Sequence, residues 1–230
     1  MRILVTGGSG AIGRHVAEEF VREGSSVISL DLRPPDHPLG GDVTDVVSDV
    51  RDGAALTRVL LEHEVSVVVH LAAALPVLAN GDPDLAMDIN VRGSQAVVEA
   101  CRTTGTTGLV HFSSKAVYGR PRPPHSHPGY VPVPEWAPRQ PADHYGISKL
   151  AGEATVRSLA EEHRLPTLIL RLGSTFGAGK EERHGTLGWL SRLVDAAVEG
   201  RTVVLAHDPG AATDLIYNGD VGRAAAAAAT

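Results

Sequence analysis

The sequence predicts an α/β protein built on a doubly wound parallel sheet. Short runs rich in β-branched residues alternate with longer segments of helical period, which is the order that repeated βαβ units produce. Several runs, such as VSVVVHL at 65–71, are apolar almost throughout, as strands are when helices cover both faces of a sheet. With 230 residues, the chain is long enough for a single domain with a sizeable core.

The β-branched runs place the strands, and the spacing of apolar residues between them places the helices. The second helix begins at Asp52, a residue type that commonly caps a helix N-terminus. We expect strands near 2–6, 26–31, 45–50, 66–71, 108–113, 167–172 and 202–206, and helices near 11–23, 52–63, 84–104, 144–163 and 185–199.

Two segments interrupt this alternation. Residues 34–41 are rich in proline and glycine, which predicts a loop after the second strand. Residues 119–141 contain eight prolines, and a loop of that length within a compact domain is usually functional or mobile. Because it ends just before Tyr145, we favour a segment that covers a site over a simple surface excursion.

The C-terminal stretch DLIYNGDVGRAAAAAAT reads as a strand followed by a helix of about two turns. Little sequence follows the last predicted strand. We therefore expect a small or truncated C-terminal lobe.

Composition excludes several classes of partner. The formal net charge of −6 comes from 21 basic and 27 acidic residues with no basic run, which argues against nucleic acid and anionic membranes. The most apolar stretch, 65–79, contains His70 and Pro76 and is too short to span a bilayer. The single Cys101 suits a reducing compartment. Glycines follow five residues after Met1, leaving no room for a signal peptide, so we expect a cytoplasmic protein.

The segment ILVTGGSGAIGRHVAEEF, at 3–20, joins the first strand to the first helix through a glycine-rich turn. Its glycines at 8, 10 and 13 fit G-x-G-x-x-G, and those at 7, 10 and 13 fit G-x-x-G-x-x-G. Absent side chains permit a tight turn, close approach of backbone N–H groups to a pyrophosphate, and close packing of helix on strand. The turn predicts a Rossmann-type dinucleotide site.

The second strand, SVISLD, ends in Asp31, where a carboxylate can accept a hydrogen bond from a ribose 2′-hydroxyl. An acid at this position favours NAD, because it would repel the 2′-phosphate of NADP. Arg33 lies two residues on and leaves NADP as the alternative, although it leads into the proline-rich loop.

In HYGISKLAGE, Tyr145 lies four residues before Lys149. The spacing places both side chains on one helix face, where the ammonium group favours the phenolate and makes the tyrosine usable as a proton-transfer group. The alternative is an amphipathic helix with tyrosine packed and lysine in solvent. Ser113 and Ser114 end a predicted central strand at the sheet edge where such folds bind ligands, which favours a catalytic site over two serines that merely close a strand.

Motifs continue in the same order along the chain. Together they resemble the NAD-dependent epimerase/dehydratase family of the extended short-chain dehydrogenase/reductase superfamily, which implies one NAD-binding Rossmann-type domain over 1–230, with 174–230 contributing to the substrate region. The matching segments are TGGSGAIG (6–13), Asp31, DVRD (49–52), HLAA (70–73), NVRGS (90–94), FSSKAVYG (112–119), YGISK (145–149), RLGSTFGAG (171–179) and DLIYNGDVGRA (214–224).

The resemblance implies individual roles. Ser114 and Tyr145 match the catalytic hydroxyl and the base, and Lys149 matches the lysine that assists the base and holds the nicotinamide ribose. His70 matches a structural position, and no second ligand is spaced to form a metal site with it. The implied cofactor residues are Gly7, Gly10, Ala11, Ile12, Gly13, Asp31, Leu32, Arg33, Asp49, Val50, Leu71, Ala72, Ala73, Asn90, Ser113, Tyr145 and Lys149, and the implied substrate residues are Ala74, Ser114, Lys115, Ser174 and Thr175.

Departures from the family pattern fall on the substrate side. Ser174 stands where family members acting on nucleotide sugars commonly have asparagine, and Ala178 stands where they have proline. Thr213 replaces the arginine that suits a substrate diphosphate. The cofactor is therefore better supported than the substrate.

The resemblance implies an NAD-dependent enzyme in which Tyr145 takes a hydroxyl proton during hydride transfer, acting on a nucleotide sugar as an epimerase or dehydratase. The alternatives are a simple dehydrogenase or reductase of a sugar acid or alicyclic alcohol, and a cofactor-binding protein without catalysis. Family members pair through the helices at 144–163 and 84–104, which implies a homodimer.

Overall fold

The computed structural model describes residues 1–179, 188–204 and 214–230. Within these ranges, six parallel strands form one sheet in the order β3-β2-β1-β4-β5-β6. This Rossmann order reverses between β1 and β4, where such sheets bind ligands. The strands are β1 (Arg2–Thr6), β2 (Ser26–Asp31), β3 (Val43–Val47), β4 (Val67–His70), β5 (Gly108–Ser114) and β6 (Thr167–Leu172), with a separate parallel pair, β7 (Ser174–Phe176) and β8 (Leu215–Tyr217).

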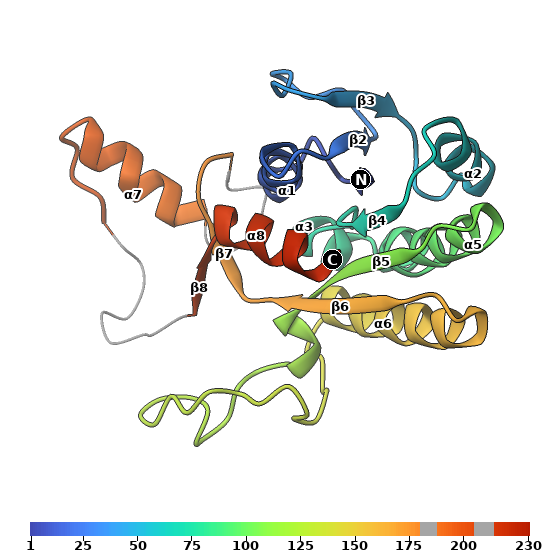
Figure 1. The fold of residues 1–230 in the computed structure, drawn as a ribbon. Coiled ribbons are helices and arrows are strands. Elements are labelled where there is room, and N and C mark those ends of the chain that lie inside the picture. Colours follow the sequence, from blue (N-terminus) through green and yellow to red (C-terminus); the bar gives the residue numbers. More distant parts are fainter. Residues whose placement is uncertain (180–187, 205–213) are drawn as a thin grey trace.

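Helices cover both faces of the sheet (Figure 1). One apolar cluster joins a sheet face to α2, α5 and α6, and a second joins the opposite face to α1 and α8. The helices are α1 (Ala11–Arg22), α2 (Gly53–Glu62), α3 (Pro76–Gly81), α4 (Pro83–Met87), the π-helical turn η1 (Asp88–Gly93), α5 (Ser94–Thr104), the 3₁₀ turn η2 (Lys115–Tyr118), α6 (His144–His163), α7 (Gly188–Val198) and α8 (Asn218–Ala228).

Alternation along β1 divides the two cores. Ile3 and Val5 belong to the cluster with α1 and α8, whereas Leu4 belongs to the cluster with α2, α5 and α6. All three side chains are buried, because successive residues of a strand point to opposite faces and helices cover both. The predicted doubly wound α/β fold is confirmed.

Most predicted elements are found, with a few corrections. The third strand lies at Val43–Val47, slightly before the predicted 45–50, and the last helix, α8, has 11 residues and exceeds the expected two turns. The predicted strand near 202–206 is wrong for 202–204, which have no regular structure. Residues 205–206, and 185–187 of the predicted helix near 185–199, lie outside the described residues.

The predicted helix near 84–104 exists as one continuous helical segment with an irregular middle. α4 leads directly into the π-helical turn η1, which leads into α5. Such turns carry one more residue than an α-helical turn and are frequent at functional sites. η1 contains Asn90, which the sequence assigned to the cofactor site.

The proline-rich segment has no regular secondary structure between η2 and α6 and projects away from the sheet (Figure 1). Its two ends meet, because a Cβ on Gly119 would lie 1.9 Å from the carbonyl oxygen of Gln140. Farther along the loop, the carbonyl oxygen of Glu135 accepts hydrogen bonds from the Tyr118 hydroxyl and from Arg171, both at 3.0 Å. The loop is thus anchored at its base and near its middle.

After β6 the described chain adds β7, α7, β8 and α8, a small C-terminal part, of which α8 packs beside α1 (Figure 1). A search of the described helices finds none with the length and apolar character needed to cross a membrane.

Candidate active site

The glycine-rich turn is pressed between the ends of β2 and β4. The Gly7 N–H donates to the Leu30 carbonyl at 2.7 Å. A Cβ on Gly7 would lie 2.9 Å from the Ala72 nitrogen, and the φ of +72° also favours glycine there. A Cβ on Gly13 would lie 2.1 Å from the Gly7 carbonyl oxygen. Glycine at both positions lets the turn pack closely against the chain after β4 and against α1, as the pyrophosphate-binding turn of this fold requires.

Asp31 lies directly beside this turn. Its carboxylate accepts hydrogen bonds from the Ser9 N–H at 3.2 Å and the Leu32 N–H at 2.7 Å. Leu32 and Arg33 are exposed, and the Arg33 carbonyl accepts from the Ser9 hydroxyl at 3.1 Å. The acid is thus fixed at the end of β2, the position of the ribose-binding acid in dinucleotide folds.

The remaining predicted cofactor residues border the same edge of the sheet. Asp49 is held by Arg51, and a hydrogen bond from that guanidinium lowers the pKa of the carboxyl. Val50 is buried beneath Gly93 of η1, where a Cβ would lie 3.1 Å from the valine. Ala11 and Ile12 open α1, and Leu71, Ala72 and Ala73 follow β4.

Two further predicted residues are buried, as Lys149 and Asn90 are. Ser113 is 5% exposed, on the side of Glu153. Ala74 is 1% exposed and packs with Ala79 and Ala86. The contacts of Ser113 with the cofactor and of Ala74 with the substrate stay predictions.

Helix α6 brings Tyr145 to the end of β5. Asp143 caps the helix by accepting the Gly146 N–H at 2.8 Å. A Cβ on Gly146 would lie 2.7 Å from the Ala116 carbonyl oxygen, and one on Gly152 would lie 2.5 Å from that of Asn90. Glycine at both positions therefore lets α6 approach η2 and η1 closely.

Ser114, Tyr145 and Lys149 converge at this point. The Ser114 oxygen accepts the Ala116 N–H at 3.1 Å, and Ser114 lies close enough to the Tyr145 side chain to favour a lower pKa of the phenol. Lys149 is 4% exposed, and its ammonium group donates to the Phe112 carbonyl at 2.6 Å. A hydroxyl pair thus lies at the carboxyl edge of the sheet, with a buried cation one helical turn behind.

The pKa directions correct one expectation. Burial raises the pKa of Tyr145, as does the charge of Asp143, while the hydrogen bond with Ser114 lowers it, and the net direction is upward. Burial lowers the pKa of Lys149 to about 8. The net direction for Tyr145 is thus opposite to the one expected from Lys149, because burial dominates and the ammonium group donates to the Phe112 carbonyl.

A buried hydrogen-bond network runs behind these residues. Ser94 donates its hydroxyl proton to the Asn90 carbonyl at 2.8 Å. The Ser94 oxygen also lies 3.1 Å from His70 Nε2, and because its proton is already used, it must accept a hydrogen bond from that nitrogen. Nε2 therefore carries the proton, and Nδ1 accepts from the Thr6 hydroxyl at 2.7 Å. Burial, with the charge of Lys149, lowers the pKa of His70 to about 3, consistent with this neutral form. Both ring nitrogens have partners, as expected of the structural role that the resemblance implied.

The network continues through the Asn90 side chain to the catalytic helix. Its amide donates to the Ser148 oxygen at 2.9 Å and to the Ala74 carbonyl at 3.2 Å, and its oxygen accepts the Ala74 N–H at 2.7 Å. Ser148 donates to the Tyr145 carbonyl at 2.9 Å. Hydrogen bonds thus connect β1, next to the glycine-rich turn, with the first turn of α6.

Replacing Ser94 with alanine is expected to lower the free energy of unfolding by about 1–3 kcal/mol, because the buried His70 N–H loses its acceptor. Thr103 on the same helix is the matched control: its hydroxyl makes the same bond to a carbonyl four residues back, at 2.8 Å, and is exposed. Thr103→Ala is expected to cost less than about 1 kcal/mol. Urea unfolding measures both, and equal losses would contradict the tautomer assignment.

An ion pair braces α6 against the sheet. Arg171 of β6 donates to both carboxylate oxygens of Glu153, at 2.7 and 2.8 Å. The same guanidinium donates to the Tyr118 hydroxyl at 2.6 Å. Sequence reasoning did not assign these three residues, nor Thr6, Ser94 and Ser148, although Ser148 and Glu153 fall within the motif that identified Tyr145.

The substrate-side predictions are brought together only in part. Ser174 begins β7 beside Lys115, whose ammonium group donates to the Ser174 hydroxyl at 2.6 Å. Thr175 is buried and pairs with Ile216 of β8. Thr213, predicted to replace a diphosphate-binding arginine, lies outside the described residues.

A glycine-rich turn with an acid beside it, and a Ser–Tyr–Lys group at the same sheet edge, define a dinucleotide-dependent enzyme of the extended short-chain dehydrogenase type. The model of the NAD dependent epimerase/dehydratase family matches residues 3–230. The chain belongs to this family, whose cofactor is NAD.

Individual relatives agree with this assignment. The chain is 30% identical over 230 residues to a UDP-glucose 4-epimerase of Mycolicibacterium smegmatis, covering 96% of this chain and 71% of the relative. Its fold matches the UDP-glucose 4-epimerase of Thermus thermophilus in complex with NAD, with a TM-score of 0.86 and 30% identity, covering 100% of this chain and 74% of the other. It is also similar to a D-erythronate dehydrogenase of Cupriavidus necator, with 31% identity over 206 residues, covering 81% of this chain and 61% of the relative.

Proposed function

We propose that this chain is an NAD-dependent epimerase of a nucleotide sugar, specifically a UDP-sugar 4-epimerase. The observation that carries the proposal is the convergence of Ser114, Tyr145 and the buried Lys149 at the carboxyl edge of the sheet that also carries the glycine-rich turn. The similarity to UDP-glucose 4-epimerases over nearly the whole chain supports the choice of substrate class.

The site residues fit NAD. The close packing at Gly7 and Gly13 gives the turn the form that binds a pyrophosphate, Asp31 would accept from a ribose hydroxyl, and Lys149, one helical turn after Tyr145, would hold the second ribose. When bound, NAD supplies a hydride acceptor for oxidation of the sugar carbon and a hydride donor for its reduction on the opposite face.

The proton chemistry falls to Tyr145 and Ser114. The raised pKa keeps Tyr145 protonated near neutral pH, which is the form that returns a proton to a carbonyl oxygen. Removing the proton of the sugar hydroxyl needs the phenolate, which the hydrogen bond from Ser114 favours. Ser114 also holds the reacting oxygen next to Tyr145.

The proposal is tested by offering a panel of UDP-sugars to the purified protein with NAD. We expect conversion to the 4-epimer, detected by chromatography, without stoichiometric accumulation of reduced cofactor at 340 nm. An equimolar rise in reduced cofactor together with a keto product would contradict the proposal.

A simple dehydrogenase of a sugar acid is the second candidate. Its support is the similarity to the D-erythronate dehydrogenase and the presence of Ser174 where nucleotide-sugar enzymes commonly have asparagine. This candidate predicts net reduced cofactor with an unphosphorylated sugar acid and no turnover of UDP-sugars, so the same panel separates the two.

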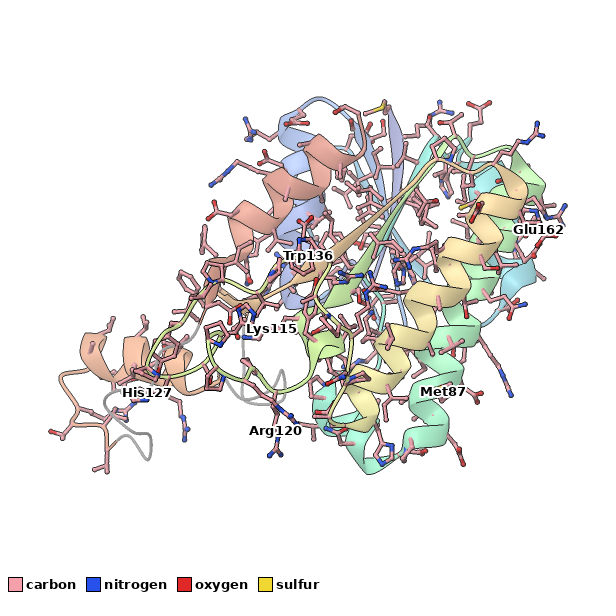
Figure 2. The ribbon with its side chains drawn as sticks, turned by 90° about the horizontal axis from the view of Figure 1, so that it is seen from below. Met87, Lys115, Arg120, His127, Trp136 and Glu162 are labelled. Carbon is pink, nitrogen blue, oxygen red and sulfur yellow. The ribbon has the colours of Figure 1, made fainter. Side chains whose placement is uncertain are left out.

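We further propose a cytoplasmic homodimer in which residues 174–230 complete the substrate region. α6 lies beside the helical segment formed by α4, η1 and α5 (Figure 2), and these elements contact one another along their length. Met87 and Ile147 are 40% and 47% exposed on this surface, which supports a second copy as its partner.

A further inference from the structure

His111 is a buried polar residue of the core that the proposed reaction does not use. Its side chain is 1% exposed, and neither ring nitrogen has a hydrogen-bond partner among the described residues. The ring of His70, whose centre lies 5.3 Å away, is bonded through both nitrogens. A neutral imidazole carries one donor and one acceptor, and leaving them unpaired in the interior costs stability. An apolar side chain would fill this position at lower cost, so the polarity of His111 points to a partner.

His111 lies on the face of β5 that α6 covers (Figure 1). Leu109, two residues earlier on the strand, belongs to the apolar cluster with α6, and alternate residues of a strand share a face. From α6, the ammonium group of Lys149 reaches the carbonyl of Phe112, the residue after His111, at 2.6 Å. Burial lowers the pKa of His111, and the charge of Lys149 lowers it further. The imidazole and the ammonium group thus lie in one buried layer, close enough to interact electrostatically.

The ammonium group of Lys149 has more donors than bonds. It carries three N–H groups, and among the described residues the Phe112 carbonyl accepts one of them. In the proposed function a second N–H would face the ribose of NAD beside Tyr145, which leaves the third for the interior. Burial lowers the pKa of Lys149 to about 8. An acceptor on this side would favour the charged form, and a neutral His111 supplies one.

The other ionisable groups near Lys149 already have partners. Glu153, one turn farther along α6, favours the charged ammonium group, but Arg171 of β6 bonds to both of its carboxylate oxygens. His70 of β4 uses both of its nitrogens. In the part of the chain that the structure describes, His111 of β5 is thus the neighbour with an unpaired acceptor.

We propose that His111 is a positioning residue for Lys149 and acts through one ordered water. The water accepts an N–H of Lys149 and donates to a ring nitrogen of His111, and this bridge keeps the ammonium group charged beside Tyr145. A buried water requires at least two polar partners, and these two side chains provide them without a direct hydrogen bond to each other. The inference rests on the proposed function only for the role of Lys149 in the reaction.

The test is an NMR titration of Lys149 in the full chain, labelled with ¹³C at the lysine Cε atoms. The chain has three lysines, at 115, 149 and 180, and Lys149→Met assigns the signal. His111→Phe is expected to lower the titration midpoint of Lys149 by about one pH unit, because a hydrogen bond to a charged group is lost. His111→Gln retains an acceptor and is expected to stay closer to the wild type. His37→Phe, which removes an exposed histidine, is the control and is expected to change nothing.

The titration needs neither NAD nor a sugar, so its result is independent of the proposed reaction. An unchanged midpoint in His111→Phe would overturn the inference, and so would an equal shift in His111→Phe and His111→Gln, which would reduce His111 to packing. If His111→Phe does not fold, a crystal structure of the wild type decides. A water within hydrogen-bond distance of both His111 and Lys149 Nζ supports the bridge, and its absence there overturns it.

The same loss of charge is expected to change the pH dependence of turnover. With the active UDP-sugar, kcat of His111→Phe is expected to decline on the alkaline side about one pH unit below the wild type, because Lys149 loses its proton at lower pH. An alkaline limb at the same pH in both proteins would contradict the positioning role. Absence of epimerisation in the wild type, together with the expected titration shift, would overturn the proposed reaction and support the bridge.

Discussion

Replacing Tyr145 with phenylalanine is expected to lower kcat by about 10²–10⁴-fold, the usual contribution of a positioned acid-base group. The change removes one oxygen atom, the one next to Ser114, and leaves the ring to pack. The backbone contacts that hold the turn, such as the Tyr145 N–H to Asn80 Oδ1 at 3.1 Å, do not involve that oxygen. Affinity for NAD is therefore expected to stay within a few fold of the wild type.

Steady-state rates with the active UDP-sugar and calorimetric binding of NAD measure the two quantities. Tyr118→Phe is the matched control, since its hydroxyl bonds to Glu135 and Arg171 in the loop anchor, and we expect a change in kcat of less than about tenfold. Unchanged turnover in Tyr145→Phe, with normal NAD binding, would remove Tyr145 from the mechanism. It would restore the alternative of a cofactor-binding protein without catalysis, the measured turnover then coming from another source.

Replacing Arg171 with methionine is expected to lower the free energy of unfolding by about 3–5 kcal/mol, because it leaves a buried charge without its partner. The Glu153 side chain is 1% exposed. Burial raises the pKa of Glu153, but the bonds from Arg171 outweigh burial and keep the carboxylate ionised. Without Arg171, Glu153 must either stay charged in the interior or take up a proton, and both cost stability.

Arg157 supplies a control on the same carboxylate. It approaches Glu153 at 3.6 Å from an exposed position on the next turn of α6, so Arg157→Met is expected to cost less than about 1 kcal/mol. The double variant Arg171→Met with Glu153→Leu is expected to regain part of the loss, since no charge remains buried. Urea unfolding of the four proteins checks the series. Similar losses of unfolding free energy for Arg157→Met and Arg171→Met would contradict the conclusion that Arg171 is the main partner of Glu153.

Local patterns predicted the fold well, and the misses have physical causes. Strands with continuous apolar runs were placed closely because burial on both faces leaves a strong signal. Both α3 and β7 were missed since six and three residues are too few to show a period. The π-helical turn could not be predicted, because its sequence keeps the helical pattern and only the backbone hydrogen bonds change, from i→i+4 to i→i+5.

The cofactor side of the site was predictable for a similar reason. The glycine-rich turn and Asp31 belong to one βαβ unit with fixed spacing, so sequence order reports spatial position. The bonds of His70 with Thr6 and Ser94, and of Lys115 with Asp214, join segments 24 to 99 residues apart. The spacing of these residues along the sequence does not predict such pairs, because only the folded chain brings them together. The raised pKa of Tyr145 was likewise a property of burial that the motif does not encode.

The π-helical turn at 88–93 determines which face of α5 points toward the sheet. Each residue of an α-helix turns the chain by about 100°, so deleting one residue there would rotate α5 by that angle relative to α4. Val97, Val98 and Cys101, now in the core, would swing away from the sheet, and Ser94 would leave His70. This segment is therefore expected to accept changes of exposed side chains, such as Arg92, far more readily than any change in length.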